Sequence, residues 1–268
     1  MAEPKIWEMN KDQWPKNFDY RVLPRPRNMI RLLLHETRHN TRLHYSSCPT
    51  ELGNPPDEYH ALSYCWGTPV PESALKKIFI DGKEVYIKPT LRTFLKTMER
   101  LHPGMRLWID AICINQDDVN ERNNQISIMG KIYEETQEVI VWLGKGDDDT
   151  NYATDQIKDF SPQACSKSDQ ETFSIYLDKL IRVPYWTRRW VLQEFALAKN
   201  LTIVRGSREI KWVDLLTGPR KSSTRILGAN GLTLSFEKYS KSPKDYKMLL
   251  SEDNCKIPVS KEQSAWQS

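Results

Sequence analysis

Apolar residues alternate with polar ones in the first third of the chain. Residues 76–87, KKIFIDGKEVYI, place apolar side chains at every second position on both sides of Asp81-Gly82, which predicts a β-hairpin with positive φ in its turn. Two earlier apolar runs, 29–36 and 42–47, are separated by a short polar segment. They predict a second hairpin or a pair of edge strands.

A different spacing, with apolar residues three or four positions apart, marks the helices. Residues 89–101 predict an amphipathic helix that Pro89 introduces and Thr90 caps. A second helix is predicted to follow the polar loop 115–124, and a third within 168–184. The apolar positions of the second are Ile126, Met129, Ile132 and Tyr133.

Nearly continuous apolar runs indicate strands that are covered on both faces. RLWIDAICI at 106–114 and TQEVIVWLG at 136–144 have this character. The acidic stretch 144–156 is predicted to be a surface loop, and 201–216 a strand, a turn and a second strand or short helix. Strands alternating with helices predict an α/β fold with a central, mainly parallel sheet.

The composition favours one large globular domain with extensions. We predict an N-terminal arm at 1–28, the folded domain at 29–217, and a polar tail at 218–268, either disordered or a truncated continuation. Apolar residues make up 39 % of the chain, enough for a sizeable core, and the net charge of +4 is too small for a nucleic-acid surface. Neither a membrane span nor a signal peptide is predicted, which favours a cytoplasmic protein.

The cysteines and histidines indicate neither a disulfide framework nor a metal site. The five cysteines are far apart and none forms a CxxC pair, which predicts reduced thiols. Cys113 could serve as the nucleophile of a hydrolase, but no histidine lies in its motif and its neighbours are apolar. A buried, inert thiol is the favoured interpretation.

Three segments together resemble one protein family. YHALSYCWG at 59–67, the block at 107–144 that begins LWIDAICINQDD, and YWTRRWVLQEFALAKN at 185–200 resemble the heterokaryon incompatibility (HET) domain, a fungal module that triggers cell death when unlike hyphae fuse. The same blocks are distantly similar to Toll/interleukin-1 receptor (TIR) domains. That similarity implies a flavodoxin-like core, with β-hairpins added on the N-terminal side and a helical insertion.

The TIR resemblance also implies a site. In active TIR domains the glutamate of a Trp-x-x-x-Glu helix serves cleavage of NAD between nicotinamide and ribose, and Trp190 and Glu194 reproduce that spacing. Glu194 is thereby the implied catalytic residue, with NAD as substrate and no other cofactor. Residues assigned to substrate binding are Ser63, Tyr64, Trp66, Gly67, Asp110 and Trp190. Asn115, Gln116 and Asp117 correspond to the mobile loop that governs access and self-association in TIR folds.

The chemistry of a carboxylate suits this role. Positive charge spreads onto the ribose in an oxocarbenium-like transition state, and a nearby carboxylate stabilises it. The structural alternative is that Glu194 only pairs with Arg188 or Arg189, beside core tryptophans. Core packing is likewise the alternative for Tyr64, and a backbone cap for Asp110.

At the level of function, two hypotheses stay open. One is an NAD-cleaving effector that self-association, or contact with other HET or TIR-like proteins or an upstream receptor, activates. The other is a non-catalytic interaction module.

Overall fold

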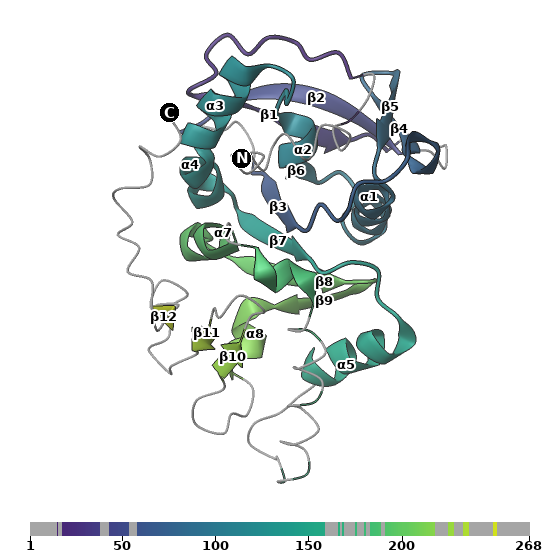
Figure 1. Cartoon of the computed structure of the whole chain (residues 1–268), viewed down its shortest axis with the longest axis vertical. Coiled ribbons are helices and arrows are strands. Elements are labelled where there is room, and N and C mark those ends of the chain that lie inside the picture. Colours follow the sequence, from purple (N-terminus) through teal and green to yellow (C-terminus); the bar gives the residue numbers. More distant parts are fainter. Residues whose placement is uncertain are drawn as a thin grey trace, which may run out of the picture.

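Nine strands form one mixed sheet that organises the protein. The computed structural model describes residues 18–37, 43–53, 58–158, 183–188 and 191–217, with five isolated residues and three short strands besides. The strand order in the sheet is β5-β4-β2-β1-β6-β3-β7-β8-β9 (Figure 1). The strands are β1 (Met29–His35), β2 (His44–Glu51), β3 (His60–Tyr64), β4 (Lys76–Ile80), β5 (Lys83–Ile87), β6 (Arg106–Trp108), β7 (Glu138–Trp142), β8 (Leu201–Arg205) and β9 (Arg208–Lys211).

The middle of the sheet is parallel and its flanks are mixed. Strands β6, β3, β7 and β8 run parallel to their neighbours in this group, and β2 also pairs in parallel with β4. The other four pairings are antiparallel. The α/β prediction is therefore confirmed, whereas a mainly parallel arrangement holds only for the central strands.

Both predicted hairpins are present. β4 and β5 are joined by Asp81 at φ 50° and Gly82 at φ 76°, the positive values that a two-residue hairpin turn requires. β1 and β2 pair along seven positions, from Met29 opposite Glu51 to His35 opposite Tyr45. They are not edge strands, because β4 continues the sheet beyond β2 and β6 continues it beyond β1.

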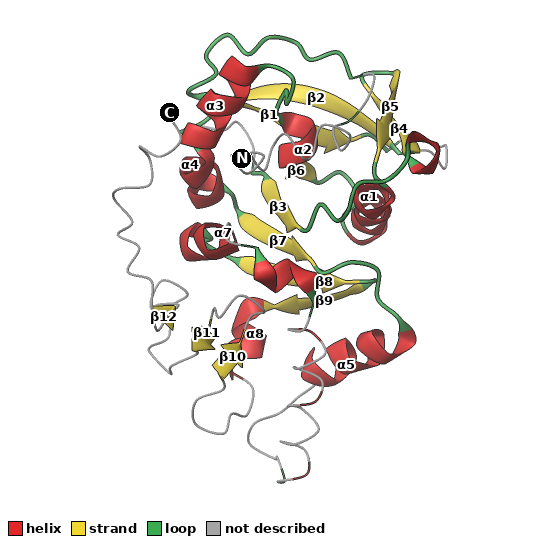
Figure 2. Ribbon diagram, in the orientation of Figure 1, coloured by secondary structure: helices red, strands yellow, loops and turns green. Residues whose placement is uncertain are grey.

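Helices lie on both sides of the central strands, with α1 on one side and α3, α4 and α7 on the other (Figures 1 and 2). The helices are α1 (Pro89–Leu101), α2 (Asp110–Cys113), α3 (Val119–Ser127), α4 (Met129–Glu135), α5 (Asp148–Lys158), α7 (Val191–Leu197) and α8 (Trp212–Thr217). Short 3-10 turns cover Glu72–Ala74 and Pro184–Thr187.

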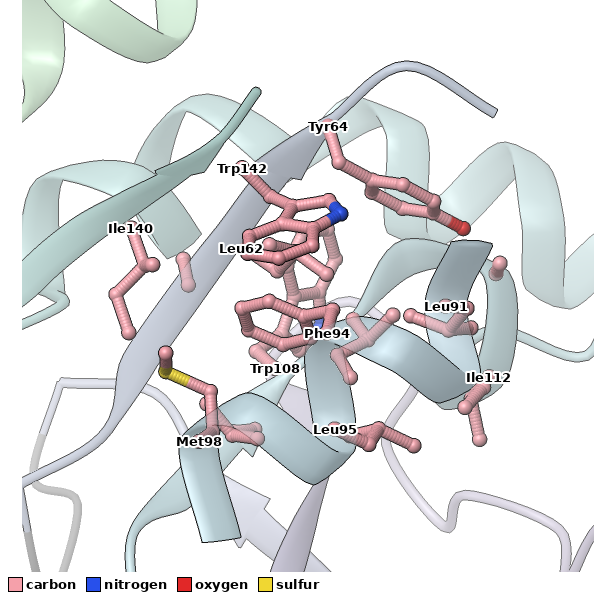
Figure 3. Close-up of a cluster of buried hydrophobic side chains, with 14 of the residues drawn as sticks. Leu62, Tyr64, Leu91, Phe94, Leu95, Met98, Trp108, Ile112, Ile140 and Trp142 are labelled. Carbon is pink, nitrogen blue, oxygen red and sulfur yellow. The ribbon is translucent and has the colours of Figure 1, made fainter. Parts of the chain in front are cut away.

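The predicted apolar stripe of α1 is confirmed and forms much of the core. Leu91, Phe94, Leu95 and Met98 are buried and face Leu62 and Tyr64 of β3 and Ile140 and Trp142 of β7 (Figure 3). The Phe94 and Trp142 rings meet edge to face at 5.7 Å. Because burial of each such side chain contributes about 1.5–3 kcal/mol, this packing fixes the carboxyl ends of β3 and β7.

Helix boundaries depart from prediction at two places near the site. Lys88, not Thr90, is the N-cap of α1, because Pro89 supplies the first helical position and the residue before a proline stays extended. The strand predicted at 106–114 ends at Trp108, and Asp110 begins α2.

Two further helices begin inside segments predicted as polar loops. The Asp118 carboxylate accepts the backbone N–H groups of Asn120 and Glu121 and starts α3 there. Asp147 accepts the N–H of Thr150 at 2.7 Å, and α5 follows where a surface loop was predicted. Both starts are side-chain caps.

Other predictions meet the limits of the described chain. The helix predicted at 168–184 lies mostly outside the described residues. Beyond residue 217, three short strands form a separate sheet, β10 (Arg225–Leu227), β11 (Thr233–Ser235) and β12 (Leu249–Leu250). Among the described helices, none is long and apolar enough to cross a bilayer.

Candidate functional site

The carboxyl end of β3 carries the centre of the site. Alternation along a strand sends Leu62 and Tyr64 toward α1 and Ser63 toward the opposite face. There the Ser63 hydroxyl donates a hydrogen bond to Oε2 of Glu194, which lies in the first turn of α7. The side chains of both residues are buried, with Ser63 1 % and Glu194 4 % exposed.

Two tyrosines complete the hydroxyl cluster around Glu194. The Tyr185 hydroxyl lies 2.5 Å from Oγ of Ser63. Because Ser63 donates its single hydroxyl proton to Glu194, Tyr185 is the donor in its hydrogen bond with Ser63. The Tyr133 side chain, from α4, also acts to lower the pKa of Glu194, and its hydroxyl donates to the Leu62 carbonyl at 3.5 Å. Tyr185, Ser63 and Glu194 therefore form a chain of hydrogen bonds from the turn at 184–187 to α7.

Arg188 is the cation of this site. Its Nη2 atom lies 3.7 Å from Oε1 of Glu194, and its guanidinium lies 5.9 Å from the centre of the Tyr185 ring. The Nη1 atom is buried and has no hydrogen-bond partner among the described residues. Burial raises the pKa of Glu194 above its ordinary value, although Arg188 and the hydrogen bond from Ser63 act in the opposite direction. The guanidinium therefore only partly compensates the buried carboxylate.

A second carboxylate, that of Asp110, lies in the field of the same arginine. The indole N–H of Trp66 donates to Oδ2 of Asp110 at 3.0 Å. Burial raises the pKa of Asp110 to about 7, with Arg188 opposing that shift and Glu194 adding to it. Two carboxyl groups that resist ionisation therefore flank one guanidinium, an arrangement typical of functional sites.

Tyr64 and Trp66 lie on the other face of the sheet from Ser63 and Glu194. Together with Lys88 and Leu91 at the start of α1, and Ala111 of α2, they line a small pocket. The predicted binding residues are thus divided between two faces, and Asp110 connects them through its hydrogen bond from Trp66. Gly67 follows with φ 70°, where the chain turns away from β3.

Sequence comparisons relate the chain to known proteins. The sequence model of the family "Heterokaryon incompatibility protein (HET)" matches residues 59–194, just over half of the 268 residues. The chain belongs to the HET family. It is 33 % identical over 180 residues to "Heterokaryon incompatibility protein 6, OR allele" of Neurospora crassa, covering 62 % of this chain and 26 % of that relative. The chain thus spans about a quarter of that relative's length, and no solved structure matches it.

Within the HET segment, the loop predicted to be mobile is held by hydrogen bonds. Gln116 is 6 % exposed, and its side-chain amide donates to the carbonyl of Asp110 at 2.9 Å. The Asn115 N–H donates to Glu121 at 2.7 Å, and the Asp117 N–H to the Asn115 side chain at 3.2 Å. The loop thus couples directly to the backbone of Asp110.

Buried polar residues of α3 fix this loop from behind. Glu121 and Gln125 are 6 % and 0 % exposed. Glu121 forms a two-pronged ion pair with Arg31 of β1, and Gln125 donates to the carbonyls of Pro26 and Met29. Partners some 90 residues earlier in the chain therefore cover these side chains.

Cys113 has the character of an inert core thiol. It is 1 % exposed, its Sγ accepts the Ile109 N–H at 3.2 Å, and burial raises its pKa to about 12. A thiol in this state supplies almost no thiolate near neutral pH, which removes the support for a cysteine hydrolase. Cys48, Cys65 and Cys113 are all free.

The sequence predicts Glu194 and Ser63 as site residues, and the structure brings them into contact. It gives no site role to three of their neighbours. Arg188 was considered only as the partner in a structural alternative, and that pairing is confirmed. Tyr185 opens the third motif and Tyr133 lies in the apolar stripe of a predicted helix, and neither pattern indicates a place near Glu194. Trp190 lies outside the described residues.

Proposed function

We propose that this HET protein is an effector of heterokaryon incompatibility, acting in the fungal cytoplasm to start cell death, and that it cleaves NAD at the nicotinamide–ribose bond when it assembles. Family membership supports the first part, together with the name of the Neurospora crassa relative. The second part rests on Glu194 and on the strand ends around it.

The observation that carries the enzymatic proposal is the hydrogen bond between Ser63 and Glu194 at the carboxyl end of β3. Numbered along the chain, the central parallel strands have the order 2-1-3-4, which matches the first four strands of the flavodoxin-like order 2-1-3-4-5. Such sheets bind ligands beyond the carboxyl ends of the strands, where the order reverses. Here that point lies between β3 and β7, beside Ser63.

In this mechanism Glu194 faces the ribose and stabilises the positive charge that develops as nicotinamide leaves. Ser63 orients the carboxylate through its hydrogen bond. The charge of Arg188 favours the carboxylate form of Glu194. A water molecule then attacks the ribose carbon, with the proton passing to Glu194 or solvent, so that ADP-ribose and nicotinamide are the products.

In the described conformation the Glu194 carboxylate is closed to substrate. Glu194 is 4 % exposed, and the Tyr185–Arg188 segment covers it. Substrate reaches the carboxylate when this segment moves and Arg188 exchanges Glu194 for a substrate anion. Self-association, or contact with another HET or TIR-like protein or an upstream receptor, supplies the free energy for that movement in our proposal.

Nicotinamide release tests the proposal directly. Concentrated full-length protein is incubated with NAD, and the parent is compared with Glu194→Gln and with Glu84→Gln, a matched change in an exposed ion pair with Lys77 on the β4–β5 hairpin. We expect turnover in the parent and in Glu84→Gln and a loss of at least 100-fold in Glu194→Gln. Turnover that survives Glu194→Gln would remove this residue from the mechanism.

The second candidate is a non-catalytic interaction module. It is favoured by the burial of Glu194 and its pairing with Arg188, which suit a residue that only stabilises the fold. In that case neither the parent nor any assembled form releases nicotinamide, and Glu194→Gln lowers stability and partner binding together. The same three proteins therefore discriminate the two functions.

A further inference from the structure

The N-terminal arm seats a proline at the carboxyl end of β3. Pro15 is buried and lines the small pocket together with Tyr64, Trp66, Leu91 and Ala111. The space that remains in this pocket is about that of one water molecule. Proline rings pack well on tryptophan and tyrosine, which is how several domains bind extended proline-containing segments. Pro15 therefore closes a pocket whose other walls come from β3, α1 and α2.

The residues beside Pro15 hold the Asp110 carboxylate in place. The indole N–H of Trp66 donates to Oδ2 of Asp110 at 3.0 Å, and the backbone N–H of Ala111 donates to Oδ1 at 2.7 Å. Both donors thus belong to residues that line the same pocket as Pro15. Asp110 in turn lies in the field of Arg188. The arm therefore covers the α1 side of the candidate site.

From Tyr20 onward the arm is bound firmly to the folded domain. The Tyr20 ring lies over the guanidinium of Arg31 at 5.1 Å, and Arg31 also donates to the carbonyl of Arg21. Leu23 is buried. In Figure 1 the described part of the arm, in purple, runs from beside β5 toward α3. These contacts give the arm a fixed end.

A weaker contact holds the arm between this fixed end and Pro15. Asp19 pairs with Lys83 of β5 at 2.7 Å, and both side chains are exposed. Exposed ion pairs add little to stability. Phe18 packs edge to face on Tyr20 at 4.5 Å and is only partly buried. Pro15 can therefore leave its pocket by a local opening, while the arm stays attached from Tyr20 onward.

We propose that the N-terminal arm is an autoinhibitory strap, in which Pro15 plugs the pocket beside Trp66 and Ala111 and its displacement opens the α1 side of the site. The regulatory role rests on the proposed function, because the opened site then admits NAD. The seating of Pro15 does not depend on turnover. A protein that binds the arm would thereby switch the site on.

Pro15→Glu tests the seat, because it places a carboxylate in an apolar, aromatic pocket close to Asp110. Pro24→Glu, at an exposed position of the same arm, is the matched control. Amide hydrogen exchange is measured by mass spectrometry across 64–68 and 110–113, and nicotinamide release from NAD is measured in the same proteins. We expect exchange at least about tenfold faster and nicotinamide release at least about threefold faster in Pro15→Glu, and parent values in Pro24→Glu.

A charge reversal keeps the test decisive if Pro15→Glu disturbs folding. Asp19→Lys opposes Lys83 with a like charge and should raise both rates about two- to fivefold, and Asp19→Lys with Lys83→Asp should restore the parent values. Parent rates of exchange in both Pro15→Glu and Asp19→Lys would overturn the strap, while nicotinamide release by the parent would still support NAD cleavage. Faster exchange with unchanged nicotinamide release would overturn the autoinhibitory role. Faster exchange where no protein releases nicotinamide would remove NAD cleavage, and the regulatory role with it, and leave only the plug.

Discussion

The hydroxyl of Ser63 hydrogen-bonds the carboxylate of Glu194, joining the end of β3 to α7 across 131 positions of the chain. A buried carboxylate without such donors would cost several kcal/mol. Ser63 is thus a determinant of whether Glu194 can be held in the interior. The hydrogen bond between Ser63 and Glu194 therefore affects both the stability of the site and its proposed chemistry.

Replacing Ser63 with alanine should destabilise the protein by about 1–3 kcal/mol, because the buried Glu194 carboxylate and the Tyr185 hydroxyl each lose a partner. Urea unfolding measures the change. Ser127→Ala removes an exposed hydroxyl that bonds only the Asn124 carbonyl, and it should cost less than about 0.5 kcal/mol. Equal losses of unfolding free energy in the two variants would mean that the Ser63 hydrogen bonds contribute no more to stability than that of the exposed Ser127.

Asp110 should make stability fall as pH rises. Its pKa is about 7 in the folded protein against an ordinary value of 3.8, so between these values the folded state holds a proton that the unfolded state has released. The contribution of Asp110 to the free energy of unfolding is fully present below about pH 4 and is lost as the pH rises through 7. It amounts to at most roughly 4 kcal/mol.

Asp110→Asn should remove this pH dependence. Unfolding free energies from pH 4.5 to 8 should decline less steeply in the variant than in the parent. Asp147→Asn is the control, because hydrogen bonds from Thr150 lower the pKa of Asp147 and place its contribution below this range. An unchanged slope in Asp110→Asn would show that Asp110 ionises normally in the fold.

Local patterns predicted the elements whose partners are close in sequence. The Asp81-Gly82 turn, the apolar stripe of α1 and the β7 run each carry their own signal, and each is confirmed. The start of α1 was misplaced because Pro89 overrides the capping preference of Thr90. The starts of α3 and α5 were missed although Asp118 and Asp147 carry capping signals.

Local sequence patterns could not predict the features that depend on residues far apart in the sequence. The predicted binding surface joins Ser63 and Tyr64, whereas the period-two alternation of β3 places them on opposite faces of the sheet. The burial of Glu121 depends on Arg31, 90 positions away, and nothing in the α3 sequence reveals that partner. Lys88 follows a strand and precedes a proline, which gives no sign of a buried ammonium.

The thiol of Cys113 should be unreactive in the native protein. It is 1 % exposed and its pKa is about 12, so both access and thiolate formation are suppressed. Cys113→Ser should leave the number and rate of fast-reacting thiols unchanged when the native protein is titrated with a disulfide reagent. The half-buried Cys65 is the comparison, and Cys65→Ser should remove one faster thiol. A fast thiol lost in Cys113→Ser would reinstate it as a candidate nucleophile.

The buried ion pair between Arg31 and Glu121 should show strong coupling in a double-mutant cycle. Arg31→Met leaves a buried carboxylate whose described partner is the Asn115 N–H, and a loss of about 3–5 kcal/mol is expected from such a break. Arg31→Met with Glu121→Leu removes both charges, so its cost should fall short of the summed single costs by at least about 1 kcal/mol. The exposed pair Arg25–Glu51 is the control, with coupling below about 1 kcal/mol.

The same ion pair should also hold the loop 115–117. Because Glu121 accepts the Asn115 N–H, and Gln116 donates to the Asp110 carbonyl, the single variants should speed amide hydrogen exchange across 115–117. Coupling no larger than that of Arg25 with Glu51 would mean that the pair is too solvated to hold the loop.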